Sequence, residues 1–168
     1  MTKEFINAFD DLSNTLRTIG SRGALLIAGA EPVNPMTIGW GLIGPVWGKP
    51  TFAVLVRPSR FTYELMGKAE AFSVNVPGES LSHACDLCGT KSGRDVDKIA
   101  EAGLTVEPGR SLAVPTIAEC PVHYECRIVH RNEVDPASMI PEISDVLYRS
   151  GDVHVVYWGT IAGAYRRA

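Results

Sequence analysis

The chain has 168 residues, of which 45% are hydrophobic and 21% charged, and its net charge is −3. This length and composition are typical of a globular protein, and we expect one domain over residues 1–168. The small net charge, spread without a block of like charges, argues against nucleic acid or a membrane surface as the main partner. No apolar run reaches the roughly 18 residues of a membrane span. Acidic residues stand where a signal peptide would have its apolar core, so we expect a cytoplasmic protein.

The N-terminal residues follow a helical pattern. Apolar side chains recur at helical spacing from Phe5 to Ile19, and the pattern stops at Gly20. Beyond it the period changes to short apolar runs separated by Pro and Gly, which are typical of strands. The predicted strands are residues 23–30, 36–43, 51–56, 71–76, 104–108, 123–130 and 154–166.

Helices are predicted between these strands. Ser59 stands at an N-cap position directly after Pro58, and Gly103 ends a segment that begins with acidic residues. Many short strands with few helices favour a closed or nearly closed antiparallel barrel whose openings the helices cover. The predicted helices are residues 59–69, 79–88, 95–103 and 141–151.

The four cysteines allow two interpretations. Cys85 and Cys88 form a C-x-x-C pair, which fits a redox pair or half of a metal site. A structural zinc site usually needs a second ligand pair of similarly tight spacing, and Cys120 and Cys126 do not supply one. We therefore expect reduced, buried thiols and no metal site.

Two segments have the composition of an anion-binding site. In RPSRFTYE (residues 57–64) a strand ends, a proline follows and a helix begins, so free backbone N–H groups meet two arginines and two hydroxyls. In CGTKSGRDVDK (residues 88–98) glycines, hydroxyls and cations surround a turn that leads into a helix. Taken alone, the first also fits a capped surface helix and the second a solvated loop.

The segment NPMTIGW (residues 34–40) places a turn, a hydroxyl and an indole side by side. Its Asn-Pro turn exposes backbone donors and acceptors. Strict alternation would put Thr37 on the face opposite Met36 and Trp40. A site for a flat heteroaromatic ligand and a hairpin corner with a core tryptophan are both consistent with this pattern.

Together these segments resemble the flavin reductase-like family of FMN-binding split barrels. The resemblance covers about residues 23–159 and rests on the order and spacing of five motifs. They are NPMTIGW (34–40), WGKP (47–50), VRPSRFTYE (56–64), FSVNVP (72–77) and CGTKSGRDVDK (88–98). The resemblance implies a mainly β Greek-key split barrel with a few peripheral helices, an FMN cofactor, and a homodimer whose flavin sites lie near the subunit interface.

The resemblance also implies which residues bind FMN. In the family the segment corresponding to residues 34–40 lies along the isoalloxazine ring and forms hydrogen bonds through its backbone and its Thr. The residues expected along the ring are Asn34, Pro35, Met36, Thr37 and Trp40. Those expected at the phosphate are Arg57, Ser59, Thr62, Ser92 and Lys98, and Asn75 corresponds to a further flavin contact.

His154 is the catalytic candidate. Relatives usually carry a His-containing stretch there, close to the open face of the flavin, where it could position a nicotinamide or give a proton to reduced flavin. The alternative is a structural histidine in a strand. The stretch ends YWGTI, where relatives usually have Gly-Glu-Val, so the carboxylate of those relatives is missing.

Three functions fit this resemblance. The first, which we expect, is a flavin reductase that transfers hydride from NADH or NADPH to N5 of FMN. The second is a flavoredoxin-like electron carrier with tightly bound FMN and a redox protein as its partner. The third is a flavin-binding protein without turnover. The sequence has no separate dinucleotide fingerprint, but family reductases lack one too, because the nicotinamide stacks directly on the flavin.

Overall fold

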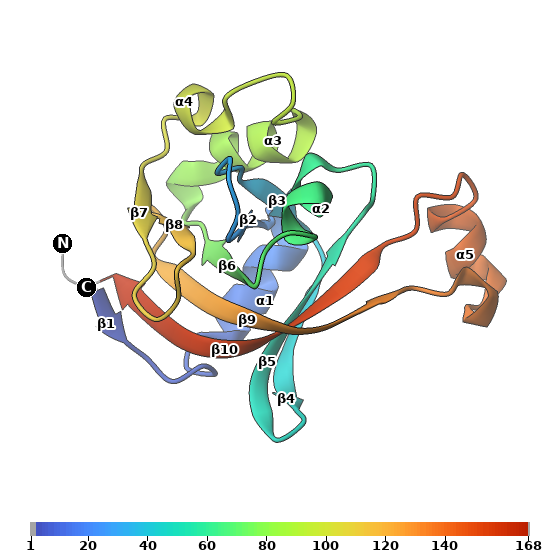
Figure 1. Cartoon of the computed structure of the whole chain (residues 1–168), viewed down its shortest axis with the longest axis horizontal. Helices are drawn as coiled ribbons and strands as arrows, with labels where there is room; N and C mark the ends of the chain where they lie inside the picture. The colour runs from blue at the N-terminus through green and yellow to red at the C-terminus, as the bar shows by residue number, and fades with distance from the viewer. Residues whose placement is uncertain (1–2, 168) are drawn as a thin grey trace.

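A computed structural model of the chain describes residues 3–167, which form a curled antiparallel sheet with helices around it (Figure 1). The strands are β1 (Lys3–Phe5), β2 (Ala24–Ala28), β3 (Met36–Ile38), β4 (Gly41–Val46), β5 (Lys49–Val56), β6 (Ala71–Val76), β7 (Val106–Pro108), β8 (Pro115–Ile117), β9 (Val122–Glu133) and β10 (Val155–Arg167). The helices are α1 (Leu12–Ser21), α2 (Phe61–Met66), α3 (Ser82–Thr90), α4 (Lys98–Ala102) and α5 (Pro141–Leu147), with short 3₁₀ turns η1 (Glu79–Leu81) and η2 (Pro136–Ser138).

The sheet curls until its two ends meet. Its strands follow the order β3-β2-β6-β9-β10-β5-β4, with β1 added beside β10, and all neighbours are antiparallel. The terminal strands β3 and β4 are separated in the chain only by Gly39 and Trp40, so both ends of the sheet lie next to each other. The prediction of a mainly β, nearly closed barrel is confirmed.

The surroundings of strand β2 explain why its sequence is uniformly apolar. Leu26 packs inside the barrel with Phe52 and Phe72. Leu25 and Ile27 point the other way, into a second cluster under α3. Because both faces of β2 are covered, the alternation of apolar and polar residues expected for a half-exposed strand is absent.

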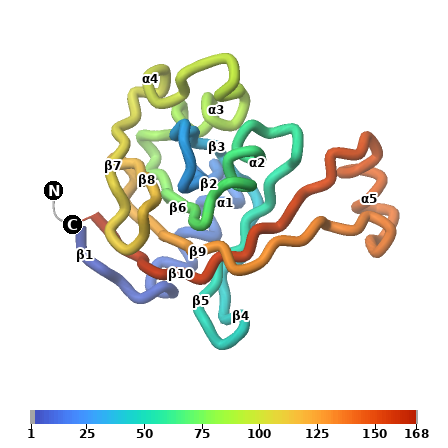
Figure 2. Tube along the Cα trace, viewed as in Figure 1, coloured from blue at the N-terminus to red at the C-terminus, as the bar shows by residue number. Residues whose placement is uncertain are grey.

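Two parts of the chain extend from the barrel. Strands β9 and β10 continue outward and carry α5 away from the body of the molecule (Figures 1 and 2). We call residues 134–153 the arm. Its side chains Ile140 and Val146 are exposed. The other extension is the β4–β5 hairpin, whose turn residues Trp47 and Gly48 both have positive φ, as a tight hairpin requires.

The structure differs from the predicted elements in three places in particular. Residues 3–5 pair with β10 as a strand instead of opening a helix, and Phe5 packs edge-on against Tyr165. The strand predicted over residues 36–43 breaks at Gly39. Strand β8 was not predicted, because it has three residues and begins with a proline.

Candidate functional site

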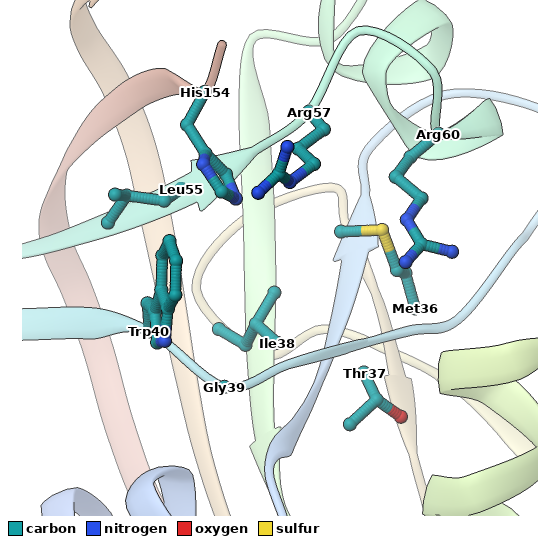
Figure 3. Close-up of a pocket in the computed structure, with 9 residues that line it drawn as sticks. All are labelled: Met36, Thr37, Ile38, Gly39, Trp40, Leu55, Arg57, Arg60 and His154. Atoms are coloured by element: carbon teal, nitrogen blue, oxygen red, sulfur yellow. The ribbon is translucent and has the colours of Figure 1, made fainter. Parts of the chain in front are cut away.

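A cavity of about 200 Å³ lies beside the break between β3 and β4 (Figure 3). We call it the strand cavity. Figure 3 shows the main chain of residues 36–40 on one side and Arg57 and His154 on the other. The residues that line it are Met36, Thr37, Ile38, Gly39, Trp40, Leu55, Arg57, Arg60 and His154.

The backbone at the break is accessible. A Cβ atom added to Gly39 would meet nothing within 4 Å, so open space lies over this stretch of main chain. The hydroxyl of Thr37 is not part of that surface, because it donates to the Cys85 carbonyl at 2.6 Å. Figure 3 shows this side chain pointing away from the cavity. The segment therefore presents its backbone, but not the Thr37 hydroxyl hydrogen, to the strand cavity.

A second cavity of about 120 Å³ adjoins the first, and Met36 and Arg60 line both. We call it the loop cavity, because the chain before α2 and the loop between α3 and α4 surround it. Its lining residues are Asn34, Met36, Ser59, Arg60, Phe61, Thr62, Cys88, Thr90, Lys91, Ser92, Gly93, Arg94 and Lys98.

Lys98 is the buried cation of the loop cavity. Its exposed fraction is 5%, and its ammonium donates to the carbonyls of Pro35 at 3.2 Å and Cys88 at 2.9 Å. Burial, together with the nearby charge of Arg60, lowers the pKa of this ammonium. Among residues 3–167 no carboxylate forms an ion pair with it. An ammonium has three donors, so one remains for an anion in the cavity.

Asn34 and Thr62 form the buried wall of the loop cavity. The Asn34 amide donates to the Thr62 hydroxyl at 2.8 Å. The loop approaches this pair so closely that a Cβ at Gly93 would lie 1.9 Å from Asn34 Oδ1. Only glycine fits there without movement of the wall. Ser92 also lines the cavity, and its hydroxyl accepts the Arg94 backbone N–H at 3.2 Å.

The arm occupies donors that the sequence analysis assigned to a phosphate. The Arg57 guanidinium donates to the carbonyls of Asp152 at 3.0 Å and Leu147 at 3.2 Å. The Ser59 backbone N–H and hydroxyl donate to the Asp152 carboxylate at 3.0 and 2.7 Å. Burial acts to raise the pKa of Asp152, but these hydrogen bonds and the Arg57 charge outweigh it and lower that pKa.

His154 lies at the edge of the strand cavity as a neutral imidazole. Its ring centroid is 4.8 Å from that of Trp40, and its Nδ1 atom is 2.9 Å from the Tyr148 hydroxyl. Burial, followed by the charge of Arg57, lowers the pKa of His154 to about 4. At neutral pH its one N–H can therefore donate a hydrogen bond, but the second ring proton, which an imidazolium would give as an acid, is absent.

Residues 18–165 match the family described as flavin reductase like domain. The chain belongs to the flavin reductase-like family. An uncharacterized protein of Archaeoglobus fulgidus is 31% identical over 150 residues, which cover 88% of this chain and 80% of that protein. The flavoredoxin of Methanosarcina acetivorans superposes with a TM-score of 0.69 at 28% identity, over 87% of this chain and 68% of the other.

A more distant structure extends the likeness in fold. The NADH:FAD oxidoreductase of Streptomyces globisporus superposes with a TM-score of 0.67 at 18% identity, over 98% of this chain and 87% of the other. These neighbours establish the fold as the split barrel of flavin reductase-like proteins. Membership in the family supports a flavin as the cofactor.

The fold of this flavin reductase-like chain brings nine of the eleven expected cofactor residues to the lining of the two cavities. Pro35 lines neither cavity, but its carbonyl accepts a hydrogen bond from Lys98. Asn75 also lines neither cavity. Its amide donates to Leu25 O and Ser73 Oγ, and its oxygen faces the Ile117 N–H and His123 Nδ1. With these partners the side chain has no capacity left for a ligand. The flavin contact expected at Asn75 stays a prediction, and these hydrogen bonds argue against a contact through its side chain.

Sequence reasoning left four polar residues of the loop cavity out of the expected set: Arg60, Thr90, Lys91 and Arg94. All four stand in the two segments identified as anion-binding, so their composition was the signal. Their individual places depend on how the segments fold together. Arg94 forms an ion pair with Glu64 and donates to Ser59 O, whereas within residues 3–167 the Arg60 guanidinium donates only to the Gly89 carbonyl, at 3.4 Å.

The cysteines are buried in the flavin reductase-like fold. Burial raises the pKa of both Cys85 and Cys88 to about 11, so both are thiols at neutral pH. Residues 3–167 contain no group of three or more His, Cys, Asp or Glu placed to hold a metal ion. Within the same residues, no helix is long and apolar enough to cross a bilayer.

Proposed function

We propose that the protein binds FMN and uses it to oxidise NADH or NADPH. The isoalloxazine ring would lie along residues 36–40 in the strand cavity, and the phosphate would lie in the loop cavity. The observation that carries this proposal is the buried ammonium of Lys98, which has no acidic partner among the described residues, beside an adjoining cavity with an open stretch of backbone.

The donor set fits a flavin phosphate. A buried charge is costly unless an opposite charge compensates it. A phosphate would supply the negative charge that compensates Lys98. Arg60 lines both cavities and would place a second positive charge beside that phosphate. Thr62 and Ser92 line the same space with hydroxyls. Because Met36 and Arg60 line both cavities, one molecule with a flat ring and a phosphate tail can occupy them together.

Bound flavin would supply the redox chemistry, since it accepts hydride at N5 and releases electrons singly or in pairs. The chain's own residues bind and orient it. Backbone groups at Gly39 would hold the edge of the ring, and the ring of Trp40 and the imidazole of His154 line the same cavity. Arg57, held by the arm, places a positive charge at the same cavity, which favours a reduced, anionic ring.

A second candidate function is electron transfer with a protein partner. It is favoured by the likeness to the flavoredoxin of Methanosarcina acetivorans and by the enclosed, buried wall of the loop cavity, which would hold FMN firmly.

We also propose that the protein is a homodimer, because apolar side chains on the arm and on the β4–β5 hairpin are exposed in the single chain, among them Val146 and Trp47.

A visible absorption spectrum during anaerobic addition of NADH and then NADPH tests the proposal. The full chain is first loaded with FMN and freed of excess flavin. Prompt bleaching of the flavin bands would establish a reductase and identify its donor. Bands that persist until dithionite is added would favour the electron carrier. Failure to bind added FMN would overturn the cofactor assignment itself.

A further inference from the structure

The arm returns to the strand cavity through one aromatic side chain. Tyr148 directly follows α5 and is buried, and its hydroxyl is 2.9 Å from Nδ1 of His154. The Arg57 guanidinium lies over the Tyr148 ring, 5.5 Å from its centroid, while it donates to the carbonyl of Leu147. The hydroxyl of Tyr148 is therefore fixed from two sides relative to the imidazole.

The direction of this hydrogen bond follows from what each partner needs. If Nδ1 donated, the phenol hydrogen of Tyr148 would be buried with no acceptor among the described residues, which is unfavourable. If the phenol donates, its hydrogen is satisfied and Nδ1 is the acceptor. In a neutral imidazole the hydrogen then resides on Nε2.

Burial is the main reason why the His154 ring is neutral, and the charged groups around it add smaller effects. Arg57, at the end of β5, and Arg60, before α2, both lower its pKa, while Asp152 in the arm acts in the opposite direction. Burial is the largest cause, and the pKa falls to about 4. The other groups in contact with the imidazole are the aromatic rings of Tyr148 and Trp40.

We propose that Tyr148 is a positioning residue of the strand cavity. Its hydroxyl holds His154 as the tautomer with hydrogen on Nε2 and turns that N–H to the cavity, where it donates to an uncharged carbonyl oxygen. The carboxamide oxygen of a nicotinamide beside the flavin has this chemistry. This role rests on the proposed function, and it replaces proton donation, because a neutral Nε2–H binds an oxygen without changing charge.

The tautomer can be read directly by ¹⁵N NMR of the imidazole nitrogens in the full chain, with and without FMN. His154→Gln identifies the signals by their loss. In the wild type we expect the pattern of a single Nε2–H tautomer that does not change between pH 5.5 and 8. In Tyr148→Phe, which keeps the ring under Arg57, we expect averaged signals of two tautomers. A wild-type ring protonated on Nδ1, or an unchanged tautomer in Tyr148→Phe, would overturn the proposal.

Kinetics and a matched variant complete the test. Loss of one positioning hydrogen bond is expected to lower kcat/KM for NADH or NADPH about fivefold, with FMN affinity within twofold of the wild type. Tyr63→Phe is the control, because the Tyr63 hydroxyl forms no hydrogen bond among the described residues, and it should change neither tautomer nor kinetics. If neither dinucleotide is oxidised but Tyr148→Phe releases the tautomer, the reductase proposal and the nicotinamide contact fail, and the control of the His154 tautomer by Tyr148 stands.

Discussion

The cations of the two adjoining cavities have different partners within the chain. In the loop cavity the Lys98 ammonium has only carbonyl partners among the described residues, so a net charge remains for a ligand to neutralise. In the strand cavity Arg57 is held by two carbonyls of the arm and lies 3.8 Å from the Asp152 carboxylate, so its charge is partly balanced within the chain. The first environment suits a phosphate, and the second suits a ring that is neutral when oxidised and carries one negative charge when reduced. The contacts of a cation, more than its presence in a motif, decide what it can bind.

The largest effect is expected from Lys98→Met. Removing one charged donor should weaken FMN binding by about 10- to 100-fold, because a hydrogen bond to a charged group contributes about 1.5–3 kcal/mol. Riboflavin, which lacks the phosphate, should lose far less. Flavin fluorescence titration measures both affinities, and Lys68→Met, at an exposed lysine after α2, is the control.

The same variant separates a ligand-binding lysine from a structural one. If Lys98 serves an anion, the flavin-free variant should be as stable as the wild type or more stable, because the cost of burying an uncompensated charge is removed. A clear drop in the melting temperature of the flavin-free variant would show that Lys98 mainly stabilises the fold.

Gly93→Ala should give the next largest effect. The added methyl would lie 1.9 Å from Asn34 Oδ1 and 3.1 Å from the Phe61 ring, so the wall of the loop cavity has to move. Overpacking of this kind typically costs 1–3 kcal/mol, and we expect FMN affinity to fall about tenfold. Gly20→Ala in α1 is the matched control, since nothing lies within 4 Å of its added Cβ. Equal affinities in both variants would show that the loop moves without affecting the site.

Arg57→Ala tests the cation of the strand cavity. Because this guanidinium faces the arm and the strand cavity, its loss should weaken FMN and riboflavin by the same factor, roughly fivefold, as expected for a hydrogen bond or two. Isothermal titration with each flavin gives the ratio. A selective loss of FMN binding would place Arg57 at the phosphate, as the family resemblance implied.

The smallest effect on flavin binding is expected from pH. His154 has a pKa of about 4, so FMN affinity should not follow a histidine titration between pH 6.5 and 8. Stability should respond below that window. Burial lowers the pKa of His123 to about 3, so from pH 6.5 downward the unfolded chain binds more protons than the folded one. As the pH falls, His123 and His154 each then lower the free energy of unfolding by at most about 1.4 kcal/mol per pH unit, which denaturant unfolding can measure. A stability that stays constant down to pH 4 would contradict these pKa values.

Much of the fold could be read from periodicity, and part of the site could not. Residues 71–76 are predicted as a strand with the boundaries that β6 has, because this short segment between Glu70 and Pro77 places apolar residues at alternate positions, at Phe72, Val74 and Val76. Local pattern also placed the cations and hydroxyls of the loop cavity in the right two segments. What the pattern lacked was the partner of each group. Whether Asn75 meets a ligand or a neighbouring strand depends on register, and whether Ser59 is free depends on the arm, 93 positions further along the chain.

The position of Arg57 links two parts of the molecule that otherwise have little in common. One guanidinium contacts the arm through Leu147 and Asp152 and lines the strand cavity. A molecule that binds the arm and shifts these contacts would change the affinity of the cavity for its ligand. Thermodynamic reciprocity then requires the cavity ligand to change the affinity of the arm for that molecule by the same factor. A partner that binds the arm would in this way distinguish the ligand-bound protein from the ligand-free one.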